Sequence, residues 1–175
     1  AAGAWYWMTR PLYTPGALAA RPDLDPAGAG LSSSLPVAEG IDLHAFSEGS
    51  GPLTLVIHGG PGAAPDGPWP ALSLLADERR FLYYHQRGCG RSTRPIDVLD
   101  GGGYRENQAR IQAALGLDQQ VADIERIRRL SGEPQIALVG HSFGGFLAAL
   151  YAAEFPDRVS TLTLITPAAV LKLPG

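Results

Sequence analysis

The sequence has 175 residues, of which 45% are hydrophobic and 18% charged, with a formal net charge of −3. This length and apolar content suffice for one core of domain size, and the slight negative charge provides no basic surface of the kind that binds nucleic acid. The longest apolar runs are far shorter than the roughly 20 residues of a membrane-spanning helix. A single cysteine, Cys89, excludes a disulfide within the chain. We therefore expect one soluble globular unit without a nucleic-acid partner or a membrane span.

The first 33 residues differ in composition from the rest of the chain. Prolines alternate there with Gly and Ala after an aromatic cluster, and proline disfavours regular structure. We predict an irregular N-terminal extension over residues 1–33 and a core domain over residues 34–175. Two locations stay open: the bacterial cytoplasm, or the periplasm or exterior if Ala1 is the first residue left after removal of a signal peptide.

From residue 34 onward, strand-like and helix-like patterns alternate. The weak alternation over residues 34–47 predicts antiparallel strands, and the apolar run over residues 53–57 predicts a buried parallel strand. The remaining elements follow from apolar runs, turn residues and helical periodicity. They are a short helix over 68–76, a strand over 81–84, a polar loop over 97–103, a helix around 121–130, a strand over 136–139, a helix over 146–155 and a strand over 160–166.

The helix around residues 121–130 has a clear apolar stripe. Val121, Ile124, Ile127 and Leu130 recur at helical spacing, which predicts one face packed on the core. The charged residues between them are expected to form a solvated face. These are Asp123, Glu125, Arg126, Arg128 and Arg129.

A glycine-flanked serine lies between the predicted strand 136–139 and the following helix, in the sequence Gly140-His141-Ser142-Phe143-Gly144. A strand, G-x-S-x-G and a helix in this order are typical of the nucleophile elbow of α/β-hydrolases. The turn is tight, so the positions two before and two after the serine must lack bulk. Ser142 would then lie at a helix N-terminus, where N–H groups and the helix dipole stabilise negative charge. The alternative is a glycine-rich turn with an incidental serine.

A second glycine-rich loop follows the predicted strand 53–57. A nucleophilic serine needs backbone N–H groups directed at the developing oxyanion, and in this fold one of them comes from such a loop. We predict that the N–H groups of Gly60 and Phe143 form the oxyanion hole. Pro61 has no N–H and is expected to fix the shape of the loop. The whole loop consists of His58, Gly59, Gly60, Pro61 and Gly62.

Four motifs together resemble the proline iminopeptidase family of serine α/β-hydrolases in their order and spacing. They are residues 58–62, residues 86–92 (Gln-Arg-Gly-Cys-Gly-Arg-Ser), residues 121–128 and the serine elbow. The resemblance covers about residues 34–170 and implies an aminopeptidase that releases an N-terminal residue. This chain departs from the family at His85, where Asp is usual, and at His141 and Phe143, where many members have Gly and Trp.

The resemblance also implies that the catalytic acid and base lie outside this chain. In this fold the triad follows the order Ser, Asp or Glu, His, whereas all four histidines (His44, His58, His85 and His141) precede Ser142. We therefore expect the α/β architecture of the N-terminal part of an α/β-hydrolase, a mostly parallel sheet with flanking helices. The cap and the last strands would be missing from this chain. A second polypeptide or a C-terminal segment would supply the cap, Asp and His.

Three functions stay open. The first is a serine aminopeptidase acting on peptides, the second a carboxylesterase or amidase acting on a small acyl substrate, and the third a non-catalytic binding protein of the same fold. In the first two, the Ser142 hydroxyl attacks the acyl carbonyl and a histidine takes its proton, so no metal or organic cofactor is required. The intact serine elbow counts against the third.

Overall fold

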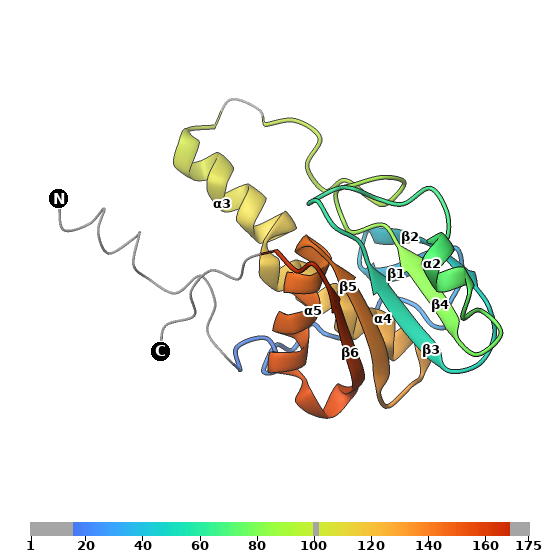
Figure 1. Ribbon diagram of the computed structural model, residues 1–175. Coiled ribbons are helices and arrows are strands. Elements are labelled where there is room, and N and C mark those ends of the chain that lie inside the picture. Colours follow the sequence, from blue (N-terminus) through green and yellow to red (C-terminus); the bar gives the residue numbers. More distant parts are fainter. Residues whose placement is uncertain (1–15, 100–101, 169–175) are drawn as a thin grey trace.

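A six-stranded sheet is the framework of the chain (Figure 1). The computed structural model describes residues 16–99 and 102–168. The strands lie in the order β1-β2-β4-β3-β5-β6. Their bounds are Ser34–Ala38 (β1), Ile41–Glu48 (β2), Leu53–Ile57 (β3), Arg80–Tyr84 (β4), Ile136–His141 (β5) and Val159–Ile165 (β6).

The sheet is mostly parallel, as the sequence predicted. Strands β4, β3, β5 and β6 run parallel to one another, while β2 pairs antiparallel with β4 and β1 pairs antiparallel with β2. Strands β3 and β5 are direct neighbours, with Ile57 opposite Gly140. Because parallel strands end at the same edge of a sheet, the segments that follow β3 and β5 begin side by side.

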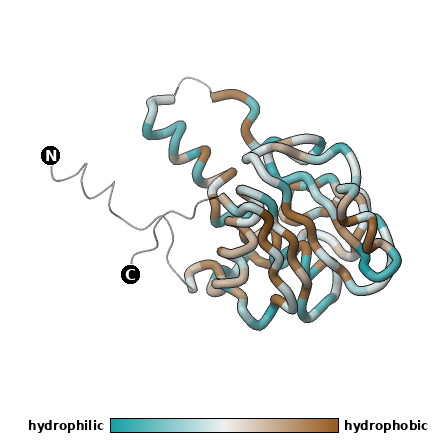
Figure 2. Tube along the Cα trace, in the orientation of Figure 1, coloured by the Kyte–Doolittle hydropathy of each residue, from teal (hydrophilic) through white to brown (hydrophobic). Residues whose placement is uncertain are grey.

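Helices cover both faces of the sheet. Helices α4 (Leu117–Ser131) and α5 (Phe143–Glu154) pack on each other and on one face, where the main apolar core lies. The short helix α2 (Pro70–Ser73) belongs to the other face, above a smaller cluster of Val56, Phe81 and Tyr83. Figure 2 shows the apolar strands at the centre of the fold. All five residues of β3 are buried, as expected for a strand covered on both faces.

Helix α3 (Tyr104–Leu115) extends away from the sheet and was not predicted (Figure 1). It has no buried residue, so it lacks the apolar stripe by which a helix is recognised in a sequence. Its Ala, Gln, Arg and Glu residues favour helix by intrinsic propensity alone. The predicted helix over 68–76 is shortened to one turn, and the 3₁₀ helix η1 (Pro156–Arg158) precedes β6.

The expectation of a solvated charged face on α4 is wrong for four of its five residues, because only Arg129 among them is exposed. Asp123 and Glu125 are 0% and 1% exposed, and Arg126 is 2% exposed. The Asp123 carboxylate accepts hydrogen bonds from Arg87 Nε and Nη2, both at 2.6 Å, and from Arg126 Nη1 at 3.0 Å. These charges are buried because each finds a partner of opposite sign, which is the condition for burying an ionised group.

A second buried carboxylate on α4 lies between this helix and α5. Glu125 accepts hydrogen bonds from Arg128, Arg129 and the Tyr151 hydroxyl. Burial opposes ionisation of the Glu125 carboxyl, but these donors outweigh it and lower its pKa. The carboxylate therefore links α4 to α5 as a charged group.

The segment before β1 is attached to the same helices. Glu154 accepts hydrogen bonds from the backbone N–H groups of Leu18 and Ala19, and Arg126 donates to the Asp23 carbonyl. Residues 1–15 lie outside the described residues, so the division at residue 33 into an extension and a core stays a prediction. None of the helices in the part of the chain that the structure describes has the length and apolar character needed to cross a bilayer.

The buried ion pairs predict a large loss of stability when one carboxylate is removed. Asp123→Ala would leave the guanidinium group of Arg87 buried without its counter-charge and that of Arg126 paired with Asp23 alone, so we expect the free energy of unfolding to fall by about 3–5 kcal/mol. Asp77 is exposed, and Asp77→Ala should change it by less than about 0.5 kcal/mol. Urea unfolding followed by circular dichroism measures both. Equal unfolding free energies for the two variants would contradict this account.

Candidate active site

Ser142 occupies a strained backbone conformation between β5 and α5. Its φ of 52° and ψ of −119° are unusual for a residue with a side chain. The strain is held by hydrogen bonds on both sides, because the Ser142 N–H donates to the Ile165 carbonyl at 3.0 Å and the Ser142 carbonyl accepts from the Ala168 N–H at 2.9 Å. A sharp strand-to-helix turn of this kind raises the serine above the edge of the sheet.

The two glycines of the G-x-S-x-G motif are required by the packing of this turn. A Cβ atom on Gly140 would lie 2.6 Å from the Gly144 carbonyl oxygen, and one on Gly144 would lie 2.1 Å from the Ile57 carbonyl oxygen. Both distances are too short for any side chain. Helix α5 therefore begins in direct backbone contact with the end of β3.

The loop 58–62 lies against the serine turn. A Cβ atom on Gly59 would be 3.1 Å from the Ser142 Cβ and 3.2 Å from His141 Nδ1. Gly60 has φ of +120°, which favours glycine, and its peptide bond to Pro61 is cis. A Cβ atom on Gly60 would be 2.4 Å from the backbone nitrogen of Gly62. The structure thus brings together the predicted nucleophile and the glycine-rich loop predicted to serve it.

The imidazole of His58 is buried and uses both of its nitrogens. Its Nδ1 lies 2.8 Å from the Gly59 carbonyl oxygen, and its Nε2 lies 3.0 Å from the backbone nitrogen of Gln86. A carbonyl requires a donor and a backbone N–H requires an acceptor, so the ring is neutral with its proton on Nδ1. Burial lowers the pKa of His58; the hydrogen bond to Gly59 opposes this effect, and nearby His85 adds to it.

The other three histidines lie in different surroundings. His85 Nε2 contacts the Pro65 carbonyl at 3.0 Å, and its Nδ1 accepts from the Arg91 N–H at 2.9 Å. His44 packs edge-on against His85, with ring centroids 4.8 Å apart. His141, next to the serine, packs edge-on against Trp69 at 5.8 Å. Among the described residues, no histidine forms a hydrogen bond with the Ser142 hydroxyl.

Gln86 is a residue at this site that the sequence analysis did not single out. The side-chain Nε2 of Gln86 donates to the His58 carbonyl at 2.8 Å. The backbone carbonyl of Gln86 accepts from the Cys89 N–H at 3.2 Å. The motif over residues 86–92 pointed to this loop, but only the fold brings it beside residues 58–62. Within the described ranges, no cluster of His, Cys, Asp and Glu has an arrangement that could hold a metal ion.

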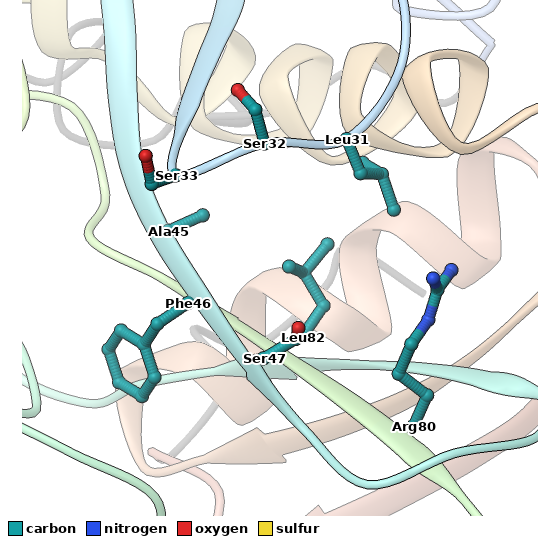
Figure 3. A pocket seen from close by; sticks show the side chains of 8 residues that line it. All are labelled: Leu31, Ser32, Ser33, Ala45, Phe46, Ser47, Arg80 and Leu82. Carbon is teal, nitrogen blue, oxygen red and sulfur yellow. The ribbon is translucent and has the colours of Figure 1, made fainter.

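A cavity of about 310 Å³ lies elsewhere, at the start of β4 (Figure 3). It is bordered by Arg80, Leu82 and Ala45 and by the segment that precedes β1. None of the predicted site residues lines it. Arg80 is the first residue of β4, whereas the serine turn and the loop 58–62 follow the carboxyl ends of parallel strands, where α/β folds bind their ligands. The cavity is therefore distinct from the candidate site.

Comparison with known proteins agrees with this geometry. The sequence profile of the α/β-hydrolase fold matches residues 52–174. The chain belongs to the α/β-hydrolase fold family. It is 30% identical over 128 residues to a proline iminopeptidase of Heyndrickxia coagulans, which confirms the resemblance noted in the sequence. It is also 37% identical over 117 residues to a human (lyso)-N-acylphosphatidylethanolamine lipase.

These alignments cover most of this chain but a minor part of each relative. They include 73% of this chain and 39% of the bacterial protein, and 66% of this chain and 30% of the human one. Among solved structures, a proline iminopeptidase-related protein from Thermus thermophilus matches with a TM-score of 0.55 and 27% identity. That match covers 77% of this chain and 43% of the other.

The neutral state of His58 leads to a prediction about pH. Because its folded-state pKa is lowered, the unfolded chain binds more protons below about pH 6.5, the ordinary value for histidine, so stability should fall as the pH drops through that value. ¹⁵N NMR at pH 7 should show a neutral His58 ring with the proton on Nδ1. A charged ring at that pH would contradict the hydrogen-bond assignment.

Proposed function

We propose that this chain supplies the nucleophile and the oxyanion hole of a serine hydrolase that acts on peptide or amide bonds. The observation that carries the proposal is the strained Ser142 turn with Gly59 of the glycine-rich loop directly against it. A strained residue at a strand end is stable only where its surroundings enforce it, and such residues concentrate at functional sites.

The proposed reaction is acyl transfer through a covalent intermediate. The Ser142 oxygen attacks the substrate carbonyl and its proton passes to a histidine, which then gives it to the leaving amine. The N–H groups of Gly60 and Phe143 stabilise the negative oxygen of the tetrahedral intermediate. Phe143 is the first residue of α5, so its N–H has no partner within the helix. Water then attacks the acyl-enzyme and releases the acid.

The base and the acid of this reaction are proposed to come from outside residues 1–175. His58 and His85 have both ring nitrogens engaged, so neither is free to take a proton from Ser142. His44 packs against His85 rather than the serine, and His141 packs on Trp69. A further polypeptide segment carrying the cap, Asp and His would complete the triad.

The more specific proposal is an aminopeptidase of the proline iminopeptidase type. The motifs at residues 58–62 and 86–92 support it, together with the similarity to named proline iminopeptidases. The comparable identity to named lipases favours a second candidate, a carboxylester hydrolase on the same scaffold. The ratio of kcat/KM for L-proline p-nitroanilide to that for p-nitrophenyl butyrate separates the two candidates.

The nucleophile can be identified by covalent labelling. A fluorophosphonate probe should label Ser142 in the protein that carries its acid and base, and peptide mapping should locate the adduct. Ser142→Ala should abolish labelling, while Ser131→Ala, which alters a serine at the far end of α4, should leave it intact. An adduct on another serine would remove Ser142 from the reaction.

The oxyanion loop can be tested at Gly60. Gly60→Val places a branched side chain at a positive φ and against the backbone of Gly62. Displacing one oxyanion donor should lower kcat by roughly 10²-fold. A Cβ atom on Gly103 would have no other atom within 4 Å, and the φ of Gly103 is −63°. Gly103→Val therefore serves as the control. Unchanged turnover in a folded Gly60→Val protein would exclude Gly60 as a donor.

A further inference from the structure

We propose that Gln86 is a positioning residue for the oxyanion hole: it holds His58, and His58 holds the peptide that carries the Gly60 N–H. This inference rests on the proposed function, because it concerns the direction of one of its two oxyanion donors. Gln86 would touch neither substrate nor reacting atoms.

Gln86 holds His58 at two points. Its side-chain Nε2 donates to the His58 carbonyl at 2.8 Å, and its backbone N–H donates to His58 Nε2 at 3.0 Å. Both residues are buried, with 2% and 1% of their surface exposed. Little solvent is therefore available to replace either bond, and a buried carbonyl that loses its donor bears the full desolvation penalty. The main chain and the ring of His58 are fixed together by one neighbour.

His58 in turn fixes the peptide between Gly59 and Gly60. Its Nδ1–H donates to the Gly59 carbonyl at 2.8 Å, and the Ala63 N–H contacts the same oxygen at 3.3 Å. The carbonyl of Gly59 and the N–H of Gly60 belong to one planar unit and point in opposite directions. Fixing the oxygen therefore fixes the direction of the Gly60 N–H. Two successive glycines allow many backbone conformations, and without the shorter bond from His58 only the 3.3 Å contact of Ala63 would restrain the peptide.

Gln86 is itself held by a rigid support. The backbone carbonyl oxygen of Gln86 accepts from the Cys89 N–H at 3.2 Å and lies 3.1 Å from the Cys89 sulfur. The next residue, Arg87, forms two hydrogen bonds of 2.6 Å to the buried Asp123 on α4. The line of contacts runs from α4 through Arg87 and Gln86 to the loop 58–62. Positioning groups of this kind are effective when their own conformations are locked.

The first test removes the amide of Gln86 without changing the length of the side chain. Gln86→Met should lower kcat by roughly 10- to 100-fold with KM nearly unchanged, because a misaligned donor weakens transition-state binding more than substrate binding. Gln135 donates a similar amide bond to the Asp157 carbonyl at 3.1 Å, but it is exposed. Gln135→Met is therefore the matched control, and it should retain the parent kcat.

Turnover must be expressed per fluorophosphonate-titrated site, so that partial unfolding is not mistaken for a positioning effect. If Gln86→Met lowers the number of titrated sites but each site turns over at the parent rate, the residue is only structural and the inference is overturned. An unchanged kcat overturns it as well. A reduced kcat per titrated site supports it.

The second test examines the His58 link by partial rescue. His58→Leu removes the donor to the Gly59 carbonyl. In His58→Asn, the side-chain amide N–H lies at the same distance from the backbone as Nδ1–H and can donate in its place. We expect His58→Asn to turn over about tenfold faster per titrated site than His58→Leu, and equal rates would overturn the link.

A readout independent of catalysis separates this inference from the proposed function. If the parent is not labelled at Ser142, the proposed function fails, and the amide resonance of Gly60 then tests the positioning by itself. If the Gly60 amide resonance is shifted or broadened by exchange in Gln86→Met but not in Gln135→Met, the positioning role of Gln86 is supported. An unmoved amide refutes it.

Discussion

The arrangement of this site depends on the backbone contact between the end of β3 and the start of α5. Strands β3 and β5 are adjacent with Ile57 opposite Gly140, and Gly144 lies so close to the Ile57 carbonyl that no Cβ atom fits. This contact sets the distance between the serine turn and the loop 58–62. Any side chain at Gly144 would separate the two by pushing α5 away from the sheet. The glycines are thus required by the approach of two main chains, and the serine lies where they meet.

A second constraint is the set of buried charges behind the sheet. Asp123 and Glu125 on α4 each bind more than one arginine, and Arg126 reaches the segment that precedes β1. Such pairs add little net stability over apolar packing, but they tolerate no loss of one partner. They are also directional, since a bidentate guanidinium fixes an orientation. Because Arg87 is one of the partners, this constraint extends from α4 to the loop beside the candidate site.

The sequence predicted secondary structure correctly where the spacing of apolar residues follows directly from burial. The run over residues 53–57 is a buried strand with the same bounds, and the stripe from Val121 to Leu130 lies on a core helix. Helix α3 could not be found by this signal, because it buries none of its residues. Most of the charged residues on α4 were wrongly assigned to the solvent for a related reason. A periodicity argument assigns polar residues to the solvent, and one of the two partners of the buried Asp123 is Arg87, which is 36 positions away in the sequence.

The sequence analysis predicted that the serine turn and the loop 58–62 act together, and the order of the strands, with β3 next to β5, places them side by side. What the sequence could not provide is the support around them, because Gln86, His58 and Gly59 are connected through one carbonyl, one imidazole and one peptide plane. Ser142 is held independently, by hydrogen bonds to Ile165 and Ala168 at the end of β6. The proposed nucleophile and the proposed oxyanion loop therefore have separate anchors, the end of β6 for Ser142 and the loop after β4 for residues 58–62. In this arrangement the direction of the Gly60 N–H, the proposed oxyanion donor, can change while Ser142 stays in place, so the two proposed contributions to catalysis are structurally separable.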